Sequence, residues 1–406
     1  MDAASSPGGP ISEALYSENM NEPVGSRQAN LSRLLRLAHL EGPLSRAILT
    51  GATGLNRSTI ADLVGDLVAL GLVEERAPDP SRRVGRPSPL VTAHPRVVAV
   101  AANPEIDALT LAVVGLDRTV RRRERIEMTG LIGPVRTAEL IGERVAAWRN
   151  DDLADTAIAG VGIAVPGLVR TSDGMVRDAP HLRWTDTALR ELVEAETDLP
   201  TVVGNDAALG VLAEHLFGAA RGIDNVVYLN GGASGIGGGL IVHGMLVSGA
   251  SGYSGEFGQN RPGIASIADR RAADGVLEDE VSRTRLLAVL GRDNADEPAL
   301  AHLLSTTDAP DVLEEIARQR RILATALANA VNVLNPAVVV LGGFLAMLAA
   351  NDAEGLTAAV AAQTMHANGE DLDIRPAALA EDRLLIGAAE AAFGELLRDP
   401  SGFVLK

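Results

Sequence analysis

The sequence predicts a mixed α/β protein in which a small helical head precedes a larger body. Three observations point to this arrangement. The chain has 406 residues, which exceeds one ordinary domain. One early segment, residues 26–96, is net basic, whereas the chain as a whole is acidic. Apolar, strand-like runs alternate with amphipathic helical stretches through the rest, as in layered α/β folds.

Charge is distributed unevenly along the chain. The net charge of −17 argues, as an average, against nucleic-acid binding, which usually needs a basic face. Residues 26–96, however, hold ten Arg and six acidic residues, a net +4, so the remainder carries about −21. Such asymmetry predicts a small nucleic-acid module attached to an acidic body. The alternative is a chance scatter of arginines.

Several functional classes are excluded by composition. The chain has no cysteine, which excludes disulfides, thiol catalysis and cysteine-ligated metal sites. Its most apolar stretch, residues 337–350, is shorter than the roughly 20 residues that span a bilayer. Residues 1–25 lack the basic start and apolar run of a signal peptide, and their Ser, Gly, Pro and Asn content predicts a disordered tail. We therefore expect a cytoplasmic protein.

Residues 26–95 carry the pattern of a helix-turn-helix. A helix from Gln28 stops at Gly42 and Pro43, a second runs from Arg46 to Thr50, and residues 51–54 form a turn before a third helix. The motif consists of the second and third helices, and the later one, the recognition helix, enters the major groove with its N-terminal residues facing the bases. The predicted DNA contacts are Ser45 and Arg46, and Asn56, Arg57, Ser58 and Thr59 at the start of the third helix.

A basic loop follows the helices and predicts a wing. Residues 72–75 and 89–92 are expected to form two short strands, and Arg82, Arg83 and Arg86 lie between them. A Gly-Arg-Pro turn extends an arginine on a stiff backbone, which suits a narrow minor groove. A structural helical bundle with a solvated basic loop is the alternative, but the order and spacing of all the parts favour DNA binding.

The body, residues 96–406, alternates strands with helices. Glycine-rich turns follow several of the strands, where ligands commonly bind in α/β folds. The expected strands are 97–101, 109–114, 157–165, 201–203, 225–229, 237–242 and 337–341, and the expected helices are 135–149 and 311–334.

Several stretches resemble the ROK family (repressors, open reading frames, kinases) in its xylose-repressor-like branch. In the head these are PLSRAILTGATGLNRSTIADLVGDLVALGLVEE and VGRPSPL. In the body they are GVGIAVPGLV, PTVVGNDAALGVLAE, NGGASGIGGGLIVHGMLVSGASGYSGEFGQ, GVLEDEVS and NPAVVVLGG. The resemblance implies a winged helix-turn-helix followed by a two-lobed, actin-like (ribonuclease H-like ATPase) body with a cleft near residues 204–206. Thr50 and Gly51 depart from the Ala-rich helix more usual there.

The resemblance also implies a sugar site. Several fixed acceptors must surround a sugar, because unpaired polar groups are costly to bury. The positions that match the family's sugar-binding residues are Asn205, Asp206, Glu256 and Glu278, with Gln259 where the family has a histidine. Glutamine still offers one acceptor and two donors. The alternative is that Asp206 caps the following helix and the glutamates lie on the surface.

Many relatives hold a structural zinc with that histidine and three cysteines, and all four ligands are missing here. We therefore predict no metal site. The loop that bears the zinc ligands in relatives, residues 261–276, should be held by packing or by charge pairs among Asp269, Arg270, Arg271 and Asp274.

Kinase members of the family begin the body with a D-x-G-G-T turn that handles phosphate and Mg²⁺. The corresponding residues 101–104 are Ala-Ala-Asn-Pro, with no Asp, Gly or Thr, and proline removes a backbone donor. The glycine-rich residues 231–239 offer only a weak phosphate-binding signal. Asp206 occupies the position of the general base in kinase members. Without a nucleotide site it is not expected to support catalysis. We therefore predict no enzyme activity and no cofactor.

Together these features predict a sugar-responsive repressor. It would bind a palindromic double-stranded operator as a homodimer or homotetramer, with a sugar or sugar phosphate as effector. Two alternatives remain open: a sugar kinase that carries a DNA-binding domain, and a constitutive DNA-binding protein whose cleft no longer binds an effector.

Overall fold

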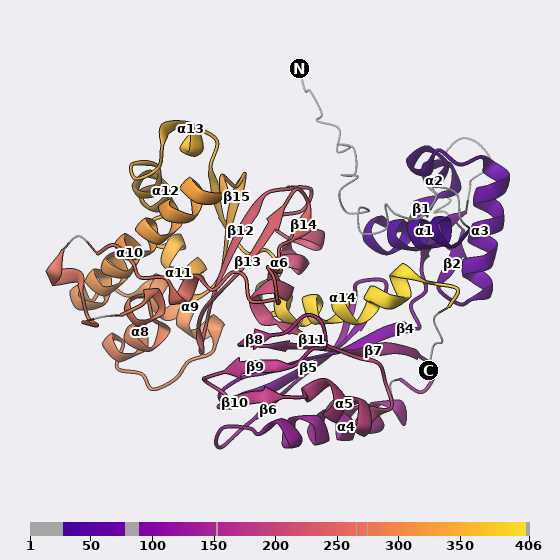
Figure 1. Cartoon of the computed structure of the whole chain (residues 1–406), viewed down its shortest axis with the longest axis horizontal. Coiled ribbons are helices and arrows are strands. Elements are labelled where there is room, and N and C mark those ends of the chain that lie inside the picture. The colour runs from indigo at the N-terminus through magenta and orange to yellow at the C-terminus, as the bar shows by residue number, and fades with distance from the viewer. Residues whose placement is uncertain (1–26, 78–88, 152, 265, 274, 403–406) are drawn as a thin grey trace.

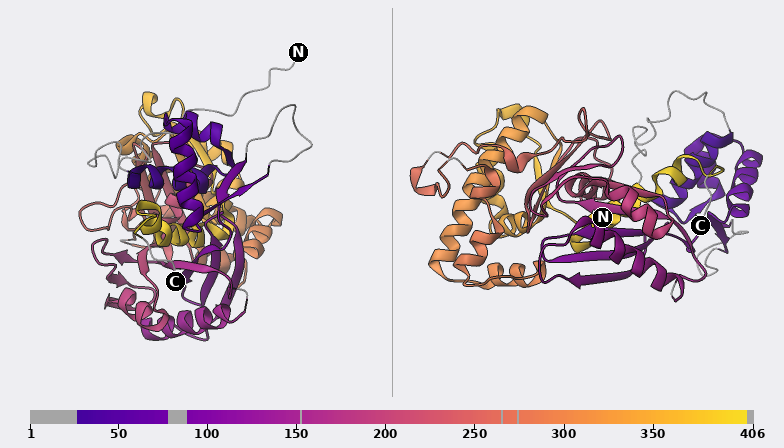
Figure 2. Two further views of the ribbon diagram at one scale, coloured as in Figure 1. Left: turned by 90° about the vertical axis from the view of Figure 1, so that its right-hand side faces the viewer. Right: turned by 60° about the horizontal axis from the view of Figure 1, so that its bottom comes forward.

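The computed structural model describes residues 27–77, 89–151, 153–264, 266–273 and 275–402. They form a head and two lobes, each lobe built on a five-stranded sheet (Figure 1). Helices of the second lobe and the head lie at opposite ends of the molecule (Figure 2). No helix in these described ranges is long and apolar enough to span a membrane.

The head contains the predicted three helices and a small antiparallel sheet of order β1-β3-β2. The predicted tail, residues 1–25, and the wing arginines Arg82, Arg83 and Arg86 lie outside the described residues. The elements are α1 (Arg27–Glu41), β1 (Leu44–Ser45), α2 (Arg46–Thr53), α3 (Arg57–Ala69), β2 (Val73–Arg76) and β3 (Leu90–Ala93).

The predicted turn at residues 51–54 is wrong, because α2 continues to Thr53. Gly54 ends the helix in the left-handed conformation, at a φ of 71°, and its N–H bonds to the Thr50 carbonyl. Arg33 of α1 also donates to the carbonyls of Ala52 and Thr53. The glycine at position 51 lowers helix propensity by about 1 kcal/mol relative to Ala, but these contacts outweigh that local preference.

The two lobes share one strand topology. In each sheet, three antiparallel strands continue into two parallel ones, giving β6-β5-β4-β7-β11 in lobe 1 and β14-β13-β12-β15-β16 in lobe 2. This duplication confirms the predicted actin-like body. Lobe 1 contains β4 (Val97–Pro104), β5 (Ala108–Gly115), β6 (Val120–Glu127), β7 (Ala157–Val165) and β11 (Thr201–Asn205). Lobe 2 contains β12 (Val226–Gly232), β13 (Gly235–Val242), β14 (Met245–Leu246), β15 (Val338–Gly343) and β16 (Asp373–Pro376).

Helices cover both sheets. Helices α4 and α5 and a small sheet of β8, β9 and β10 cover the outer face of lobe 1. Helices α7 to α12 pack on one face of lobe 2. The bounds are α4 (Pro134–Arg149), β8 (Leu168–Val169), β9 (Val176–Ala179), β10 (Trp184–Thr187), α5 (Leu189–Thr197), α7 (Leu277–Glu280), α8 (Arg283–Val289), α9 (Glu297–Thr306), α10 (Pro310–Leu334), α11 (Phe344–Ala350), α12 (Ala353–Ala361) and α13 (His366–Gly369).

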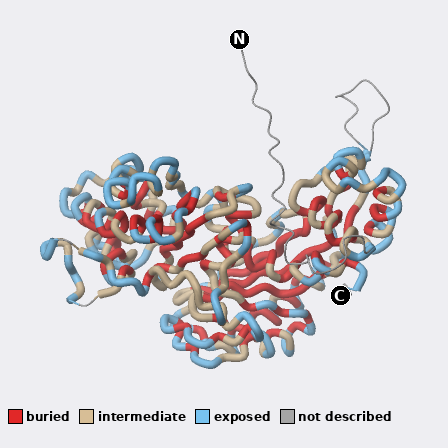
Figure 3. The backbone as a smooth tube through the Cα atoms, turned by 45° about the horizontal axis from the view of Figure 1, so that its top comes forward, coloured by how far each residue is buried: buried red, intermediate tan, exposed pale blue. Residues whose placement is uncertain are grey.

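The central strands are buried on both faces (Figure 3). Their apolar runs therefore read clearly in the sequence. The edge strand β6 was not predicted, because six of its eight residues are charged. Its side chains alternate between half-buried and exposed, and its arginines pair with neighbouring acids, as in the pair between Arg125 and Glu105. A charged edge discourages pairing with other chains.

Two helices cross between the lobes. Helix α6 (Asp206–Phe217) follows β11 of lobe 1 but packs on β12 and β13 of lobe 2. Helix α14 (Arg383–Arg398) follows lobe 2 but returns to pack on β7 and β4 of lobe 1. The two helices meet at Gly387, where a Cβ atom would collide with the carbonyl of Leu209. This close crossing joins the lobes.

The head also packs against helix α14. Leucines of α1 and α3 share one hydrophobic cluster with Phe393 and Leu396 of α14. At the centre of this contact, His39 is 1% exposed, and its Nε2 lies 3.0 Å from Glu390 Oε2 while its Nδ1 lies 2.6 Å from the Leu116 carbonyl. The head is therefore fixed to lobe 1 by a continuous core and a buried ion pair.

Burial disfavours the charged imidazole, but the carboxylate of Glu390 outweighs it and raises the pKa of His39. An ion pair whose histidine pKa is raised stabilises the folded state below the unfolded pKa, about 6.5, and that contribution is lost as pH rises through the folded value. The pair should thus make head docking strongest in mildly acidic solution.

We expect His39→Leu to lower the free energy of unfolding by about 3–5 kcal/mol at pH 6, because Glu390 stays buried without its cation. The difference from the wild type should shrink toward pH 9. Urea unfolding at several pH values measures both, with the exposed His302→Gln as a matched control. A gap that is independent of pH would contradict a charged His39.

Candidate functional site

The N-terminus of α3 presents the predicted reading residues on the surface. Asn56, Arg57 and Ser58 are exposed, and Thr59 is half-buried. The Asn56 side chain caps the helix, accepting from the Thr59 N–H at 2.9 Å and from the Ser58 hydroxyl at 2.7 Å. This cap fixes the position of the first turn, so Arg57 projects from a rigid helix end.

The two predicted contacts at the start of α2 have local partners. Ser45 caps α2 by accepting from the Ile48 N–H at 3.2 Å. Arg46 forms a bidentate pair with Glu75 of β2, at 2.7 and 2.8 Å. This pair joins α2 to β2, the strand before the predicted wing. Arg46 therefore fixes α2 relative to β2 within the head.

A cavity of about 540 Å³ lies between the lobes at the start of α6. All five predicted sugar-binding positions line it, so the structure brings together side chains from β11, α6, the 3₁₀ helix η3 (Phe257–Gln259) and α7. Four further polar side chains of the lining were not predicted: two lie in the glycine-rich motif without having been assigned a role, and the other two lie in a loop that matches no motif. They are Asp178, His181, Asn230 and Ser234.

Three of the five predicted residues are hydrogen-bonded to other parts of the cavity wall or to each other. Asn205 donates to the Gly167 carbonyl at 3.0 Å and accepts from the Ala208 N–H. Glu278 accepts from the Ile236 N–H at 3.1 Å and from Gln259 Nε2 at 2.6 Å. These contacts hold the walls of the cavity in place. Of the three predicted carboxylates, Asp206 and Glu256 accept fewer hydrogen bonds than Glu278.

The carboxylate of Asp206 sits at the base of the cavity. It accepts from the Ala207 N–H at 2.8 Å, while the cap of α6 is supplied by Asn205 instead. Burial raises the pKa of Asp206 to about 7, and Glu256 adds to this rise while Arg383 opposes it. Burial and nearby Glu278 likewise raise the pKa of Glu256. The surroundings of both carboxyl groups therefore favour their protonated forms.

Close packing explains the glycine-rich stretch of β12 and β13. Gly235 has a φ of 125°, and a Cβ there would collide with the Glu278 carboxylate. A Cβ at Gly239 would collide with Val211 and the Ala207 carbonyl of α6. These glycines let α6 and α7 approach the sheet, which accounts for them without a bound phosphate.

A second cavity of about 650 Å³ adjoins the first, on the far side of Asp206. Residues 101–104 lie within strand β4 here, and Asn103 donates to the Ala164 carbonyl. The turn that follows places Glu105 and Asp107 on the cavity wall. Arg383 packs against Gly342 and Gly343 and pairs with Glu297 at 2.8 Å. Two carboxylates and an arginine that is already ion-paired thus line the cavity near Gly342 and Gly343.

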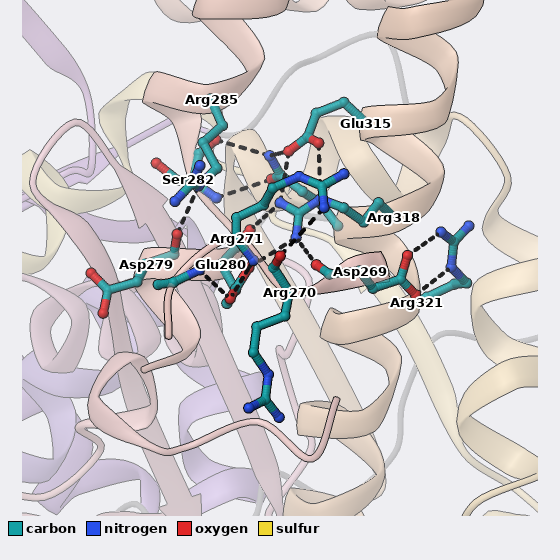
Figure 4. A network of polar contacts seen from close by, with 12 residues as sticks. Asp269, Arg270, Arg271, Asp279, Glu280, Ser282, Arg285, Glu315, Arg318 and Arg321 are labelled. Atoms are coloured by element: carbon teal, nitrogen blue, oxygen red, sulfur yellow. Dashed lines mark hydrogen bonds and ion pairs between the residues drawn. The ribbon is translucent and has the colours of Figure 1, made fainter. Parts of the chain in front are cut away.

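The loop of residues 261–276 is anchored by a buried arginine (Figure 4). Arg318 of α10 is fully buried; it donates to Glu280 at 3.0 Å, to Glu315 at 2.7 Å and to the backbone carbonyl of Asp269 at 2.7 Å. Glu280 in turn accepts from the backbone N–H groups of Arg271 and Ala272. Among the described residues, no three His, Asp or Glu side chains are grouped to hold a metal.

Of the charge pairs predicted within this loop, those of Asp269 can be compared with the structure, and its partner comes from outside the loop. Asp269 pairs with Arg321 of α10 at 2.7 Å, and Arg271 uses its backbone N–H toward Glu280. Asp274 lies outside the described residues. The partners come from α7 and α10, which sequence proximity could not reveal.

We expect Arg318→Leu to lower the free energy of unfolding by about 3–5 kcal/mol, because Glu280 and Glu315 remain buried without their cation. Arg321→Leu removes a half-exposed ion pair and should cost less than about 1 kcal/mol. EDTA should change neither value. Urea unfolding measures both changes. Equal losses of unfolding free energy in the two variants would contradict a role of the buried Arg318 ion pairs in holding the loop.

An acid whose pKa is raised in the folded state destabilises the protein as pH rises through that value. Asp206→Asn should therefore match the wild type in stability near pH 4 and exceed it at pH 8, by up to about 1.4 kcal/mol for each unit of pKa shift. Thermal unfolding across this range tests the expectation. A variant that is less stable than the wild type at pH 8 would show that the Asp206 carboxylate is stabilised in the folded protein.

Comparisons with known proteins agree with this structure. The ROK family pattern matches residues 106–394. The xylose repressor of Caldicellulosiruptor bescii is 24% identical over 391 residues, covering 88% of this chain and 93% of that protein. The glucokinase of Halalkalibacterium halodurans is 31% identical over 207 residues, covering 46% and 61%. A solved ROK family transcriptional regulator, a homologue of the E. coli MLC protein, superposes with a TM-score of 0.74 at 23% identity over 91% of this chain and 98% of that one, which confirms the predicted fold. The chain therefore belongs to the ROK family.

Proposed function

We propose that this protein is a sequence-specific transcriptional repressor of carbohydrate-utilisation genes, controlled by a sugar or sugar derivative in the 540 Å³ cavity. The observation that carries the proposal is the head with its exposed, capped α3 terminus, joined to a ROK body. Similarity to xylose repressors over most of the chain supports it. The domain division is residues 26–95 for DNA binding and 96–406 for the effector.

In this proposal, α3 enters the major groove and Arg57 reaches a base edge or a phosphate. Asn56, Ser58 and Thr59 supply neutral donors and acceptors beside it, while Ser45 and Arg46 set the position of α2. Arg82, Arg83 and Arg86 would add the wing contact. A homodimer or homotetramer presents two heads to a palindromic operator. The acidic body discourages contact with DNA elsewhere.

The coupling between cavity and head would run through α14. Its first residue, Arg383, reaches Glu297 of lobe 2; its middle meets α6, which begins at the cavity; and its Glu390 holds His39 of the head. A sugar that binds one arrangement of the lobes better than the other would move the head through these contacts. In a dimer, a small rotation changes the spacing of the two reading helices.

The second candidate function is a sugar kinase, because a glucokinase matches part of the chain. The carboxylates Glu105 and Asp107 and the paired Arg383 line the space that a nucleotide would need, which favours the regulator. A coupled ATP assay with xylose and several hexoses separates the two. Turnover by the wild type that Asp206→Asn abolishes would establish the kinase.

The proposal is tested by selecting an operator from random duplexes with the purified full chain and titrating it with sugars in a band-shift assay. We expect a specific site and a change in its affinity with at least one sugar. An operator affinity that no sugar alters would favour a constitutive DNA-binding protein, and the failure to select any site would contradict DNA recognition.

We expect Arg57→Ala to weaken operator binding by about 1–3 kcal/mol if Arg57 contacts a base. If it contacts a phosphate, the slope of log affinity against log salt should fall by about 0.9 instead. Arg136→Ala is the matched control and should change neither quantity, because Arg136 is half-exposed and its helix α4 lies away from the head (Figure 1). Equal effects of the two variants would argue against α3 as the reading helix.

A further inference from the structure

The outward face of α3 carries an acidic side chain that no described contact explains. The buried residues of this helix are Ile60, Leu63, Val64 and Leu67. At the period of a helix, the opposite face consists of Ser58, Asp62, Gly65 and Ala69. All four of these residues, which we name the outward stripe, are exposed, and α3 lies at the outer edge of the head (Figure 1).

The outward stripe has the spacing of base-reading residues. The recognition helix of a homeodomain contacts bases through residues spaced i, i+3, i+4 and i+7. Counted from Ser58, these are positions 58, 61, 62 and 65 of α3. Ala61 and Gly65 have no polar side-chain group, and the Ser58 hydroxyl already donates to Asn56 at 2.7 Å. Asp62 is therefore the one member of this set whose side-chain polar atoms make no hydrogen bond with any described residue.

A second aspartate on the same helix has a structural partner. Asp66 accepts from Arg27 of α1 at 2.8 Å, which joins the two helices. Asp62 has no such partner among the described residues, and it lies four positions from Asp66, where two like charges destabilise a helix. Aspartate is also a weak helix former away from the N-terminus. Local stability therefore gives no reason for a carboxylate at position 62.

Gly65 lies one turn after Asp62 on the outward stripe, and close packing does not account for it. A Cβ atom there would have no other described atom within 4 Å. A glycine inside a helix lowers the stability of the helix relative to alanine. The missing side chain does, however, let another molecule approach the backbone of α3 closely. The short carboxylate of Asp62 needs such an approach in order to reach a base edge.

We propose that Asp62 is a specificity-determining residue, which accepts a hydrogen bond from the N4 amino group of a cytosine in the major groove while Gly65 permits the close approach. This inference rests on the proposed function and adds a base contact to it. Cytosine presents only this donor in the major groove, thymine and guanine present acceptors, and adenine places an acceptor beside its donor. An ionised carboxylate can only accept, so it suits cytosine best.

The charge of Asp62 also acts against other sequences. The phosphates of any duplex repel a carboxylate that enters the groove, whatever the sequence. The hydrogen bond to cytosine offsets this repulsion only at a matching site, so the same side chain favours one base pair and disfavours the rest. In this arrangement Arg57 supplies attraction to DNA, and Asp62 supplies discrimination between sequences.

Band-shift titration of the full chain tests the inference, with the selected operator and every single-base-pair variant of one half-site. The wild type should prefer cytosine at one position by about tenfold, the order of discrimination that one base contact provides. Asp62→Asn should change this preference from cytosine to adenine, because an amide pairs with N6 and N7 of adenine. Asp62→Ala should abolish the preference at that position and leave the other positions unchanged.

Asp66→Asn is the matched control, because it makes the same change of charge on the same helix outside the outward stripe. It should leave every base preference unchanged. Gly65→Ala should raise the midpoint of thermal unfolding and yet weaken operator binding, two opposite changes that a merely structural role would not produce. Circular dichroism verifies that each variant is folded, and the two Asp62 variants provide independent tests of the same contact.

Unchanged base preferences in both Asp62 variants would overturn the inference and leave the proposed function intact. The same loss of preference in Asp66→Asn would also overturn it, because charge alone would then be the cause. Operator binding by Gly65→Ala that is as tight as that of the wild type would overturn the close approach. If the wild type selects no operator at all, DNA recognition itself is contradicted, and the inference falls with it.

Discussion

The crossing of α6 and α14 is the contact on which the arrangement of the whole molecule depends. Each helix leaves one lobe and packs on the other, and the absence of a side chain at Gly387 lets their backbones approach. Any larger residue there would push α14 away from Leu209. Because α14 also packs on β4 and β7, such a displacement would disturb lobe 1 and the head together. One glycine therefore sets the relation of three parts of the chain.

The buried cluster around Arg318 fixes a loop through ion pairs and backbone hydrogen bonds. A buried guanidinium costs desolvation energy, and it is tolerated only when nearly all its donors are satisfied. Arg318 meets this condition through two carboxylates and two backbone carbonyls. Glu280, two residues after Glu278, connects this cluster to α7. The short helix α7 thus places Glu278 on the cavity wall and Glu280 against Arg318.

Local signals in the sequence were enough to predict the head's helices and the buried strands. Ser45 and Asn56 act on residues three positions away, so their role is readable from neighbours. The end of α2 was missed because Arg33 of another helix stabilises it. The strand β6 was missed because its charges mask the alternation.

Long-range partners account for what the sequence could not reveal in the site. The five residues that the family resemblance marks line one cavity, but the resemblance does not show which of them are hydrogen-bonded within the protein. His39 and Glu390 are separated by 351 positions, and Arg318 and Glu280 by 38. Neither pair belongs to a periodic pattern, so only the folded chain places the partners together.

The continuous core between head and lobe 1 also constrains how such proteins can be recombined. A reading head attached by a flexible linker could be exchanged between relatives as a cassette. Here an exchanged head must bring a histidine that fits Glu390 and leucines that fit Phe393 and Leu396. A chimaera that swaps only the residues before position 96 would bury an unpaired carboxylate and mismatched surfaces. Under the proposed function, a change of operator specificity would therefore disturb the structure less if it altered the exposed first turn of α3 than if it replaced the head.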